Sequence, residues 1–217
     1  KEGTEPGAED LDAAKWKPSL KLMQLRLSGE AVINQYESKN GSMWRLSLPA
    51  TSQTAPAVTA IPLDKIIDLT ASLDNEGKVN FAGGQLPEGF DSWVIVRIGH
   101  TSTGHENATA GAGKGLECDK FNPEAITLQF NNWFGQAFAQ TDPQLAGEVL
   151  KLFHMDSWEA GSQNWSKDFA KQFRNRRGYD IQPWLLAMTG LPLCDEASSE
   201  KFLHDVRQTI AEMLHDV

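Results

Sequence analysis

The chain has 217 residues, of which 40% are hydrophobic and 23% charged, and its formal net charge is −9 at pH 7. This length and composition are typical of one large globular domain, or of a small module joined to part of a larger one. The negative charge argues against a nucleic-acid interface or a basic membrane patch, and no apolar run reaches the roughly 18 residues of a membrane span. The composition is compatible with a neutral or small-molecule substrate, but it does not identify a particular substrate.

Residues 1–19 are predicted to form a loose leader, because they are rich in Glu, Gly and Pro and show no hydrophobic periodicity. They do not have the pattern of a secretory signal peptide. The two cysteines, Cys118 and Cys194, lie far apart and match no zinc or redox spacing. Since a hydrophobic core of this size does not need a disulfide cross-link for stability, we expect buried free thiols rather than a disulfide.

Residues 20–98 predict a β-rich subdomain of short strands and turns. The clearest strand is Trp93-Val-Ile-Val-Arg-Ile98, which lies between Gly89 and Gly99. A largely apolar run with glycines at both ends is typical of a buried strand.

Residues 99–217 have a different pattern, in which helices alternate with a strand. A long loop, His100–Gly115, is followed by Asn122-Pro-Glu, which predicts a capped helix start. The later elements are expected as a strand over Val149–Met155, a helix from Ser166 to a stop at Gly178, a short helix over Pro183–Met188, and a last helix with Phe202, Val206, Ile210 and Met213 on one face.

This order predicts an α/β fold with a parallel sheet. A single strand–helix unit cannot close a barrel, which needs eight. Either the N-terminal strands complete an unusual small fold or the chain is a piece of a longer one, and we favour the piece.

The tetrad Asp156-Ser-Trp-Glu159 follows the expected strand Val149–Met155 directly. Active sites of α/β proteins gather at the carboxyl ends of strands. A carboxyl group shielded from water by an aromatic ring suits general acid work, and the ring of Trp158 also suits a sugar. The alternative is structural: Glu159 caps a turn or pairs with an arginine such as Arg174.

Asp156 and Glu159 do not form a ready catalytic pair, because residues three apart on a strand point to opposite faces. Glycosidase carboxylates face one pocket, roughly 5–10 Å apart, and come from different strands. We therefore expect the partner of Glu159 elsewhere, and a sugar-binding or structural role for Asp156.

A second acidic cluster, Glu117, Asp119 and Lys120, lies between the long loop and the predicted helix start. Negative charge is favoured near a helix N-terminus, so helix capping competes here with a contact to substrate or cation. His100 and His105 border the same loop, and either can be a surface histidine or a ligand-binding residue.

The chain resembles glycoside hydrolase family 106 in five ungapped blocks that keep the family's order over residues 30–217. The blocks are Ile61–Thr70, Trp93–Gly104, Gly115–Lys120, Asp156–Trp165 and Phe173–Asp180. Several blocks in order are far more specific than one. Characterised members are large bacterial, calcium-dependent, inverting α-L-rhamnosidases.

The resemblance implies a partial (β/α)8 TIM-barrel section preceded by a β-rich insertion, with the boundary between residues 98 and 99. It implies that Glu159 is the catalytic carboxylate. The candidate substrate-binding residues are Glu117, Asp119, Asp156, Trp158 and His100. Calcium is expected as a family cofactor, without ligands assigned to particular positions, and the other partners are a carbohydrate and the remainder of a parent polypeptide.

Two functions compete. The first is an inverting glycosidase acting on terminal α-L-rhamnosyl or similar bonds, with a periplasmic or extracellular location. The second is a catalytically silent carbohydrate-binding or structural module in which Trp158, Trp165 and Trp133 are stacking platforms or core. Trp133, on a helical apolar stripe, is expected in the core.

Overall fold

A computed structural model describes residues 33–43, 59–89, 91–108, 111–152, 154 and 158–217. This part of the chain is helical and contains no β-strand. Its helices, with short 3-10 helices marked η, are α1 (Tyr36–Lys39), η2 (Leu63–Lys65), η3 (Thr70–Ser72), η4 (Gly111–Gly113), α2 (Pro123–Asn132), α3 (Phe134–Gln140), α4 (Pro143–Val149), α5 (Phe169–Arg177), η5 (Gln182–Thr189) and α6 (Glu196–Asp216).

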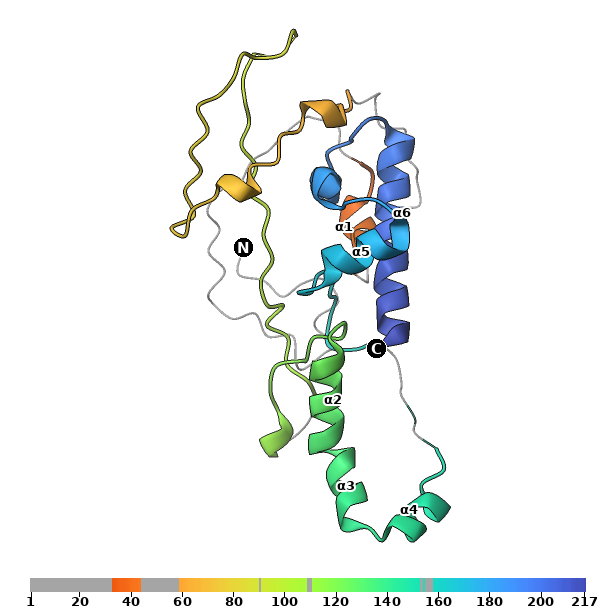
Figure 1. Ribbon diagram of the computed structural model, residues 1–217. Helices are drawn as coiled ribbons and strands as arrows, with labels where there is room; N and C mark the ends of the chain where they lie inside the picture. Colours follow the sequence, from red (N-terminus) through yellow and green to blue (C-terminus); the bar gives the residue numbers. More distant parts are fainter. Residues whose placement is uncertain (1–32, 44–58, 90, 109–110, 153, 155–157) are drawn as a thin grey trace.

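The core lies where α1, α5, η5 and α6 come together (Figure 1). The buried hydrophobic side chains of this cluster are Ile33, Phe121, Phe169, Phe173, Ile181, Ala187, Leu193, Phe202, Leu203, Val206 and Met213. Full burial of one such large side chain contributes roughly 1.5–3 kcal/mol. The C-terminal third of the chain therefore supplies most of the stability of the described residues.

The helix boundaries follow from local sequence signals. The Asp195 carboxylate caps α6 by accepting a hydrogen bond from the Ser198 backbone N–H at 2.6 Å. At the C-terminal end of α5, Gly178 has a φ of +81°, the left-handed conformation that ends many helices. The predicted helix from Ser166 to Gly178 and the predicted last helix are both confirmed, the first beginning at Phe169.

Two segments before residue 98 join this C-terminal core. The Ile33 N–H donates to the carbonyl of Gly190 at 2.7 Å, and Ile61 forms an isolated parallel bridge with Leu193. Residues on both sides of the expected boundary thus share one hydrophobic cluster.

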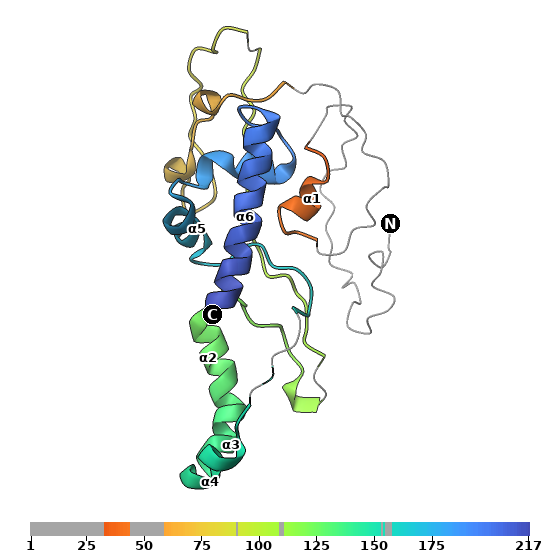
Figure 2. The same ribbon diagram turned by 90° about the vertical axis from the view of Figure 1, so that its right-hand side faces the viewer.

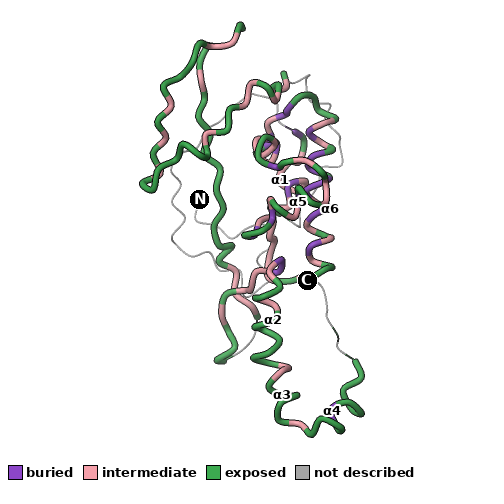
Figure 3. Tube along the Cα trace, viewed as in Figure 1, coloured by how far each residue is buried: buried purple, intermediate pink, exposed green. Residues whose placement is uncertain are grey.

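Helices α2, α3 and α4 form an arm that extends away from the core (Figures 1 and 2). Asn122 caps α2 as expected, accepting from the Glu124 N–H at 3.0 Å. The predicted single helix is interrupted at Trp133, whose φ and ψ are −120° and −83°. The arm is mostly exposed (Figure 3), and Trp133 is 67% exposed, so the expectation that it belongs to the core is wrong.

The predicted partial (β/α)8 barrel with a β-rich insertion is also wrong for the described residues. Trp93–Ile98 has no regular structure, and Val94 is 80% exposed. Val149 ends α4, and Leu152, 84% exposed, lies in an irregular stretch, while Phe153 and Met155 fall outside the described residues. A strand needs a neighbour to pair its backbone groups, and an apolar run alone does not provide one.

Among the helices that the structure describes, none combines the length and apolarity needed to cross a bilayer.

Candidate functional site

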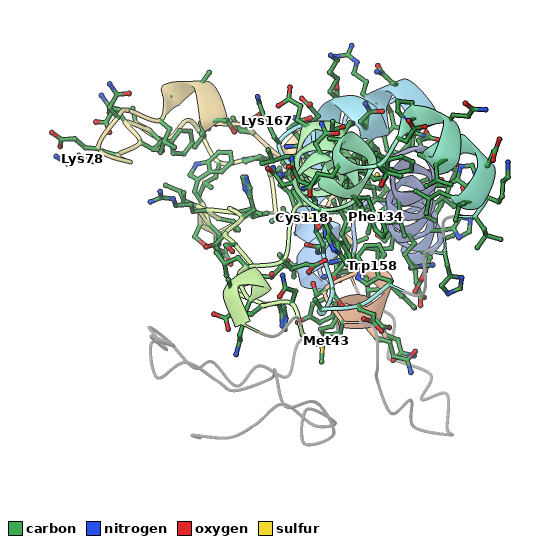
Figure 4. The ribbon with its side chains drawn as sticks, turned by 90° about the horizontal axis from the view of Figure 1, so that it is seen from below. Met43, Lys78, Cys118, Phe134, Trp158 and Lys167 are labelled. Carbon is green, nitrogen blue, oxygen red and sulfur yellow. The ribbon has the colours of Figure 1, made fainter. Side chains whose placement is uncertain are left out.

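Three short segments, 105–107, 115–121 and 158–165, are joined by hydrogen bonds near the core; Figure 4 labels Cys118 of the second and Trp158 of the third. The Glu117 N–H donates to the His105 carbonyl at 2.9 Å, and this pairing holds the first segment to the second. The Lys120 N–H donates to the side-chain oxygen of Gln163 at 3.0 Å and holds the second to the third. The fold thus brings the acidic cluster at Glu117–Lys120 next to the segment that contains Trp158 and Gln163.

A tight turn follows Glu159. Ala160 and Gly161 both have left-handed φ values, +58° and +82°. The indole N–H of Trp158 donates to the Gly161 carbonyl at 2.6 Å and closes the turn. A left-handed alanine is strained, and such strain is often found beside functional groups.

The indole of Trp158 is half-buried between charged and aromatic neighbours. Its ring meets Phe121 edge-on, with centroids 5.8 Å apart, and the Lys120 ammonium lies 5.7 Å from its centroid. Lys120 is only 8% exposed and forms an ion pair with Glu117 at 3.1 Å. Glu117 therefore neutralises a buried cation rather than capping a helix.

Asp119 is also held by internal contacts. Its carboxylate accepts hydrogen bonds from the side-chain amide of Gln163 and, at 3.0 Å, from the Phe121 N–H. Between the two acidic residues, burial and then the Glu117 carboxylate raise the pKa of the Cys118 thiol, which favours its protonated form. Both cysteines are free thiols; Cys118 is half-buried and Cys194 is exposed, so the predicted burial is wrong for Cys194.

The side chain of Glu159 is exposed and has no hydrogen-bond or ion-pair partner among the described residues. The structural alternative is that Glu159 caps a turn or pairs with an arginine such as Arg174. Among the described residues Glu159 accepts no capping hydrogen bond, and Arg174 pairs with Asp180 at 3.1 Å. Asp156, the other acidic residue of the tetrad, lies outside the described residues. The expected shielding of this carboxyl group from water by Trp158 is therefore not seen, because Glu159 is exposed.

His100 is exposed and meets Trp165 edge-on, with ring centroids 6.1 Å apart. Trp165 in turn packs on Phe169 of the core at 5.2 Å. His100 therefore lies beside the third segment, where its ring contacts Trp165 rather than an acidic residue of the site.

Sequence reasoning missed Gln163, which links Asp119 to the turn after Glu159. A lone glutamine carries no motif, and only its place within the family-like block Asp156–Trp165 could have indicated it. It also missed Arg207 of α6, which lines a hollow beside Trp158, because the helix was interpreted only by its apolar face.

Within the described residues, no three His, Cys, Asp or Glu side chains come together as metal ligands. Glu117 and Asp119 are instead held by Lys120 and Gln163, respectively.

Comparison with known proteins gives consistent results. The sequence profile of the α-L-rhamnosidase family, glycoside hydrolase family 106, matches residues 7–217. A solved rhamnosidase from Novosphingobium sp. PP1Y is 30% identical and superposes with a TM-score of 0.68 over 88% of this chain. A protein of Formosa agariphila named "Putative beta-glucuronidase" is 32% identical over 180 residues, or 82% of this chain.

The chain spans only a small part of these relatives, 18% of the Novosphingobium rhamnosidase and 15% of the Formosa protein. Within that span the family profile covers nearly every residue, including all three segments of the site. The chain therefore belongs to glycoside hydrolase family 106, the α-L-rhamnosidase family.

Proposed function

We propose that this chain is the section of a glycoside hydrolase that supplies an acidic catalytic group, Glu159, for hydrolysis of terminal α-L-rhamnosyl or similar glycosidic bonds. The observation that carries the proposal is the family match over residues 7–217, within which Glu159 is exposed and has no partner among the described residues. A catalytic acid must be free to reach the glycosidic oxygen, and this carboxylate is.

The mechanism proposed is inverting. Glu159 donates a proton to the leaving oxygen while a second carboxylate activates water on the opposite face of the sugar, roughly 6.5–9.5 Å away. Glu117 and Asp119 are poor candidates for the second group, because Lys120 and Gln163 already hold them. The base is therefore proposed to come from another part of the polypeptide.

Trp158 is proposed to hold the sugar ring beside the acid. Aromatic faces pack well against the C–H groups of a sugar, and the turn at Ala160–Gly161 fixes this indole through its N–H. The site as proposed thus combines a fixed aromatic surface with a free carboxylate.

The relatives' names differ in the sugar, since one is a rhamnosidase and the other is named as a β-glucuronidase. A rhamnoside is the first substrate to test, and a glucuronide is the second. Calcium dependence is proposed only from the family. A periplasmic or extracellular location is proposed because polysaccharides do not cross the cytoplasmic membrane.

The test is Glu159→Gln in the full polypeptide that carries this chain, assayed on an alkyl α-L-rhamnoside, whose alkoxide leaving group needs a proton. Removal of a general acid is expected to lower kcat about 10²–10⁴-fold with sugar affinity nearly unchanged. Glu148→Gln, an exposed carboxylate on α4, is the matched control and is expected to be neutral. Near-normal turnover by Glu159→Gln rejects the assignment, and sugar binding without hydrolysis by the unaltered protein supports the silent binding module instead.

A further inference from the structure

A hollow of about 290 Å³ opens beside Trp158, between the turn after Glu159, α1 and α6. This volume is at the lower end of small-molecule pockets, which hold roughly 300–1,000 Å³, and suits a single sugar ring. Its lining residues are Ser38, Gly41, Met43, Trp158, Ser162, Gln163, Arg207 and Ile210. Figure 4 shows Trp158 and Met43 on the side of the molecule where α1 lies.

Arg207 is the one charged residue among those that line the hollow. It is half-buried, and its single hydrogen bond among the described residues is from Nη1 to the Lys39 carbonyl at 2.8 Å. A guanidinium has five N–H donors, so most of its hydrogen-bonding capacity is unused. No carboxylate pairs with it within the described residues.

Other arginines nearby are paired, which makes Arg207 an exception. Arg176 contacts Glu212 at 3.3 Å and Asp216 at 2.5 Å, and Arg177 also pairs with Glu212. A half-buried cation without a counter-charge is costly in a protein unless an anion reaches it. Among the described residues that line the hollow the single charge is positive, which favours a negatively charged ligand group.

The hydroxyl of Ser162 provides a second, independent observation. Ser162 lines the same hollow, and its buried hydroxyl oxygen has no hydrogen-bond partner among the described residues. Buried polar atoms are nearly always paired, so a buried hydroxyl without a partner needs an explanation such as a bound water or a ligand group. Met43, Ile210 and the Trp158 ring supply apolar surface around it.

We propose that this hollow binds a sugar unit that carries a carboxylate, a hexuronic acid, next to the residue cleaved at Glu159. Arg207 pairs with the carboxylate, Ser162 hydrogen-bonds to a ring hydroxyl, and the sugar packs against Trp158. A planar carboxylate matches the guanidinium donors in a two-bond geometry. The inference rests on the proposed function in one respect, that the ligand is a saccharide.

A purely structural role for Arg207 gives a different result. In that case the guanidinium only holds the carbonyl of Lys39 at the end of α1. Removal of Arg207 would then lower stability and weaken acidic and neutral sugars equally, without altering the ratio of their affinities.

The experiment measures the affinities of methyl β-D-glucuronide and methyl β-D-glucoside by calorimetry, using the full polypeptide. The unaltered protein is expected to bind the glucuronide about tenfold to a hundredfold more tightly, the range for a hydrogen bond to a charged group. Arg207→Gln is expected to reduce this ratio to about one. Arg174→Gln, which removes an exposed arginine, is the control and leaves the ratio unchanged.

Absence of a glucuronide preference in the unaltered protein overturns the proposal even if Arg207→Gln does not fold. A preference that survives in a folded Arg207→Gln protein overturns it as well. Ser162→Ala is expected to weaken the glucuronide about threefold to tenfold, and an unchanged affinity counts against the assigned pose. Glu159→Gln keeps the preference while losing hydrolysis, so failure of the catalytic assignment and failure of this binding site are separate outcomes.

Discussion

The side-chain amide of Gln163 donates a hydrogen bond to the carboxylate of Asp119, 44 residues earlier in the chain. The same amide group accepts from the Lys120 N–H at 3.0 Å and donates to the Trp165 carbonyl at 3.1 Å. One glutamine thus connects the acidic segment to the segment that carries Glu159. The relative position of these two segments depends on an uncharged donor at residue 163.

Gln163→Glu removes that donor and places a second carboxylate against Asp119. We expect the free energy of unfolding to fall by about 1–3 kcal/mol, because a half-buried acceptor loses its partner and meets a like charge. Urea unfolding followed by tryptophan fluorescence measures the change. Gln136→Glu makes the same substitution at an exposed position of α3 and is expected to cost little. Equal effects of the two substitutions would contradict the linking role.

Gly161→Ala is expected to disturb the turn after Glu159. The φ of +82° is strained for any L side chain, at a cost of roughly 1–2 kcal/mol, and an added Cβ would lie 2.5 Å from the His105 ring. The stability should fall by at least that amount, and the Trp158 fluorescence should shift as its indole loses the hydrogen bond at Gly161. Gly115→Ala, where an added Cβ meets nothing within 4 Å, is the control, and a comparable loss there would refute the argument.

The helix ends of this chain could be predicted from the sequence because capping is local. Asn122 begins a helix and Gly178 ends one through hydrogen bonds to groups within four residues. The neighbouring residues in the sequence are therefore enough to predict these ends. The strands could not be predicted in this way. Trp93–Ile98 and Val149–Met155 are apolar, but whether an apolar run becomes a strand depends on partners far away in the chain.

The candidate site was predictable only in part. The family-like blocks pointed to Glu117, Asp119 and Trp158, and the fold does bring these residues close together. The hydrogen bonds that occupy Asp119 depend on a distant glutamine, and the position of Arg207 depends on how α6 packs against α1. Neither contact has a signature in the local sequence.

Phe173→Ala tests where the stability of the described residues resides. Phe173 is fully buried and packs on Tyr179 and Phe202, with centroids 5.1 and 5.8 Å away. Its removal is expected to cost about 3–5 kcal/mol, the sum of lost burial and a cavity. Trp133→Ala removes a larger ring from the exposed arm and should cost about 1 kcal/mol or less. Chemical denaturation of both variants makes the comparison, and a larger loss at Trp133 would show that the arm is covered in solution.

Asp205 on α6 gives the clearest pH prediction, because it is a nearly buried carboxylate with two donors. The Tyr179 hydroxyl donates to it at 2.8 Å and the Lys201 ammonium at 2.6 Å. Burial raises the pKa of the Asp205 carboxyl, but the hydrogen bonds from Lys201 and Tyr179 outweigh it and hold the pKa below its usual value. On the other side of the contact, burial and this carboxylate raise the pKa of Tyr179.

A carboxyl group whose pKa is lower in the folded state stabilises the protein above its unfolded pKa, near 4, and loses this contribution as the pH falls through the folded value. Asp205→Asn is therefore expected to cost about 1–3 kcal/mol at neutral pH and to flatten the decline in stability below about pH 4. Asp180→Asn, at an exposed pair with Arg174, should cost under about 1 kcal/mol. Denaturant unfolding from pH 7 to pH 2 tests both variants, and an Asp205→Asn protein with the acid dependence of the unaltered chain would show that another carboxylate causes it.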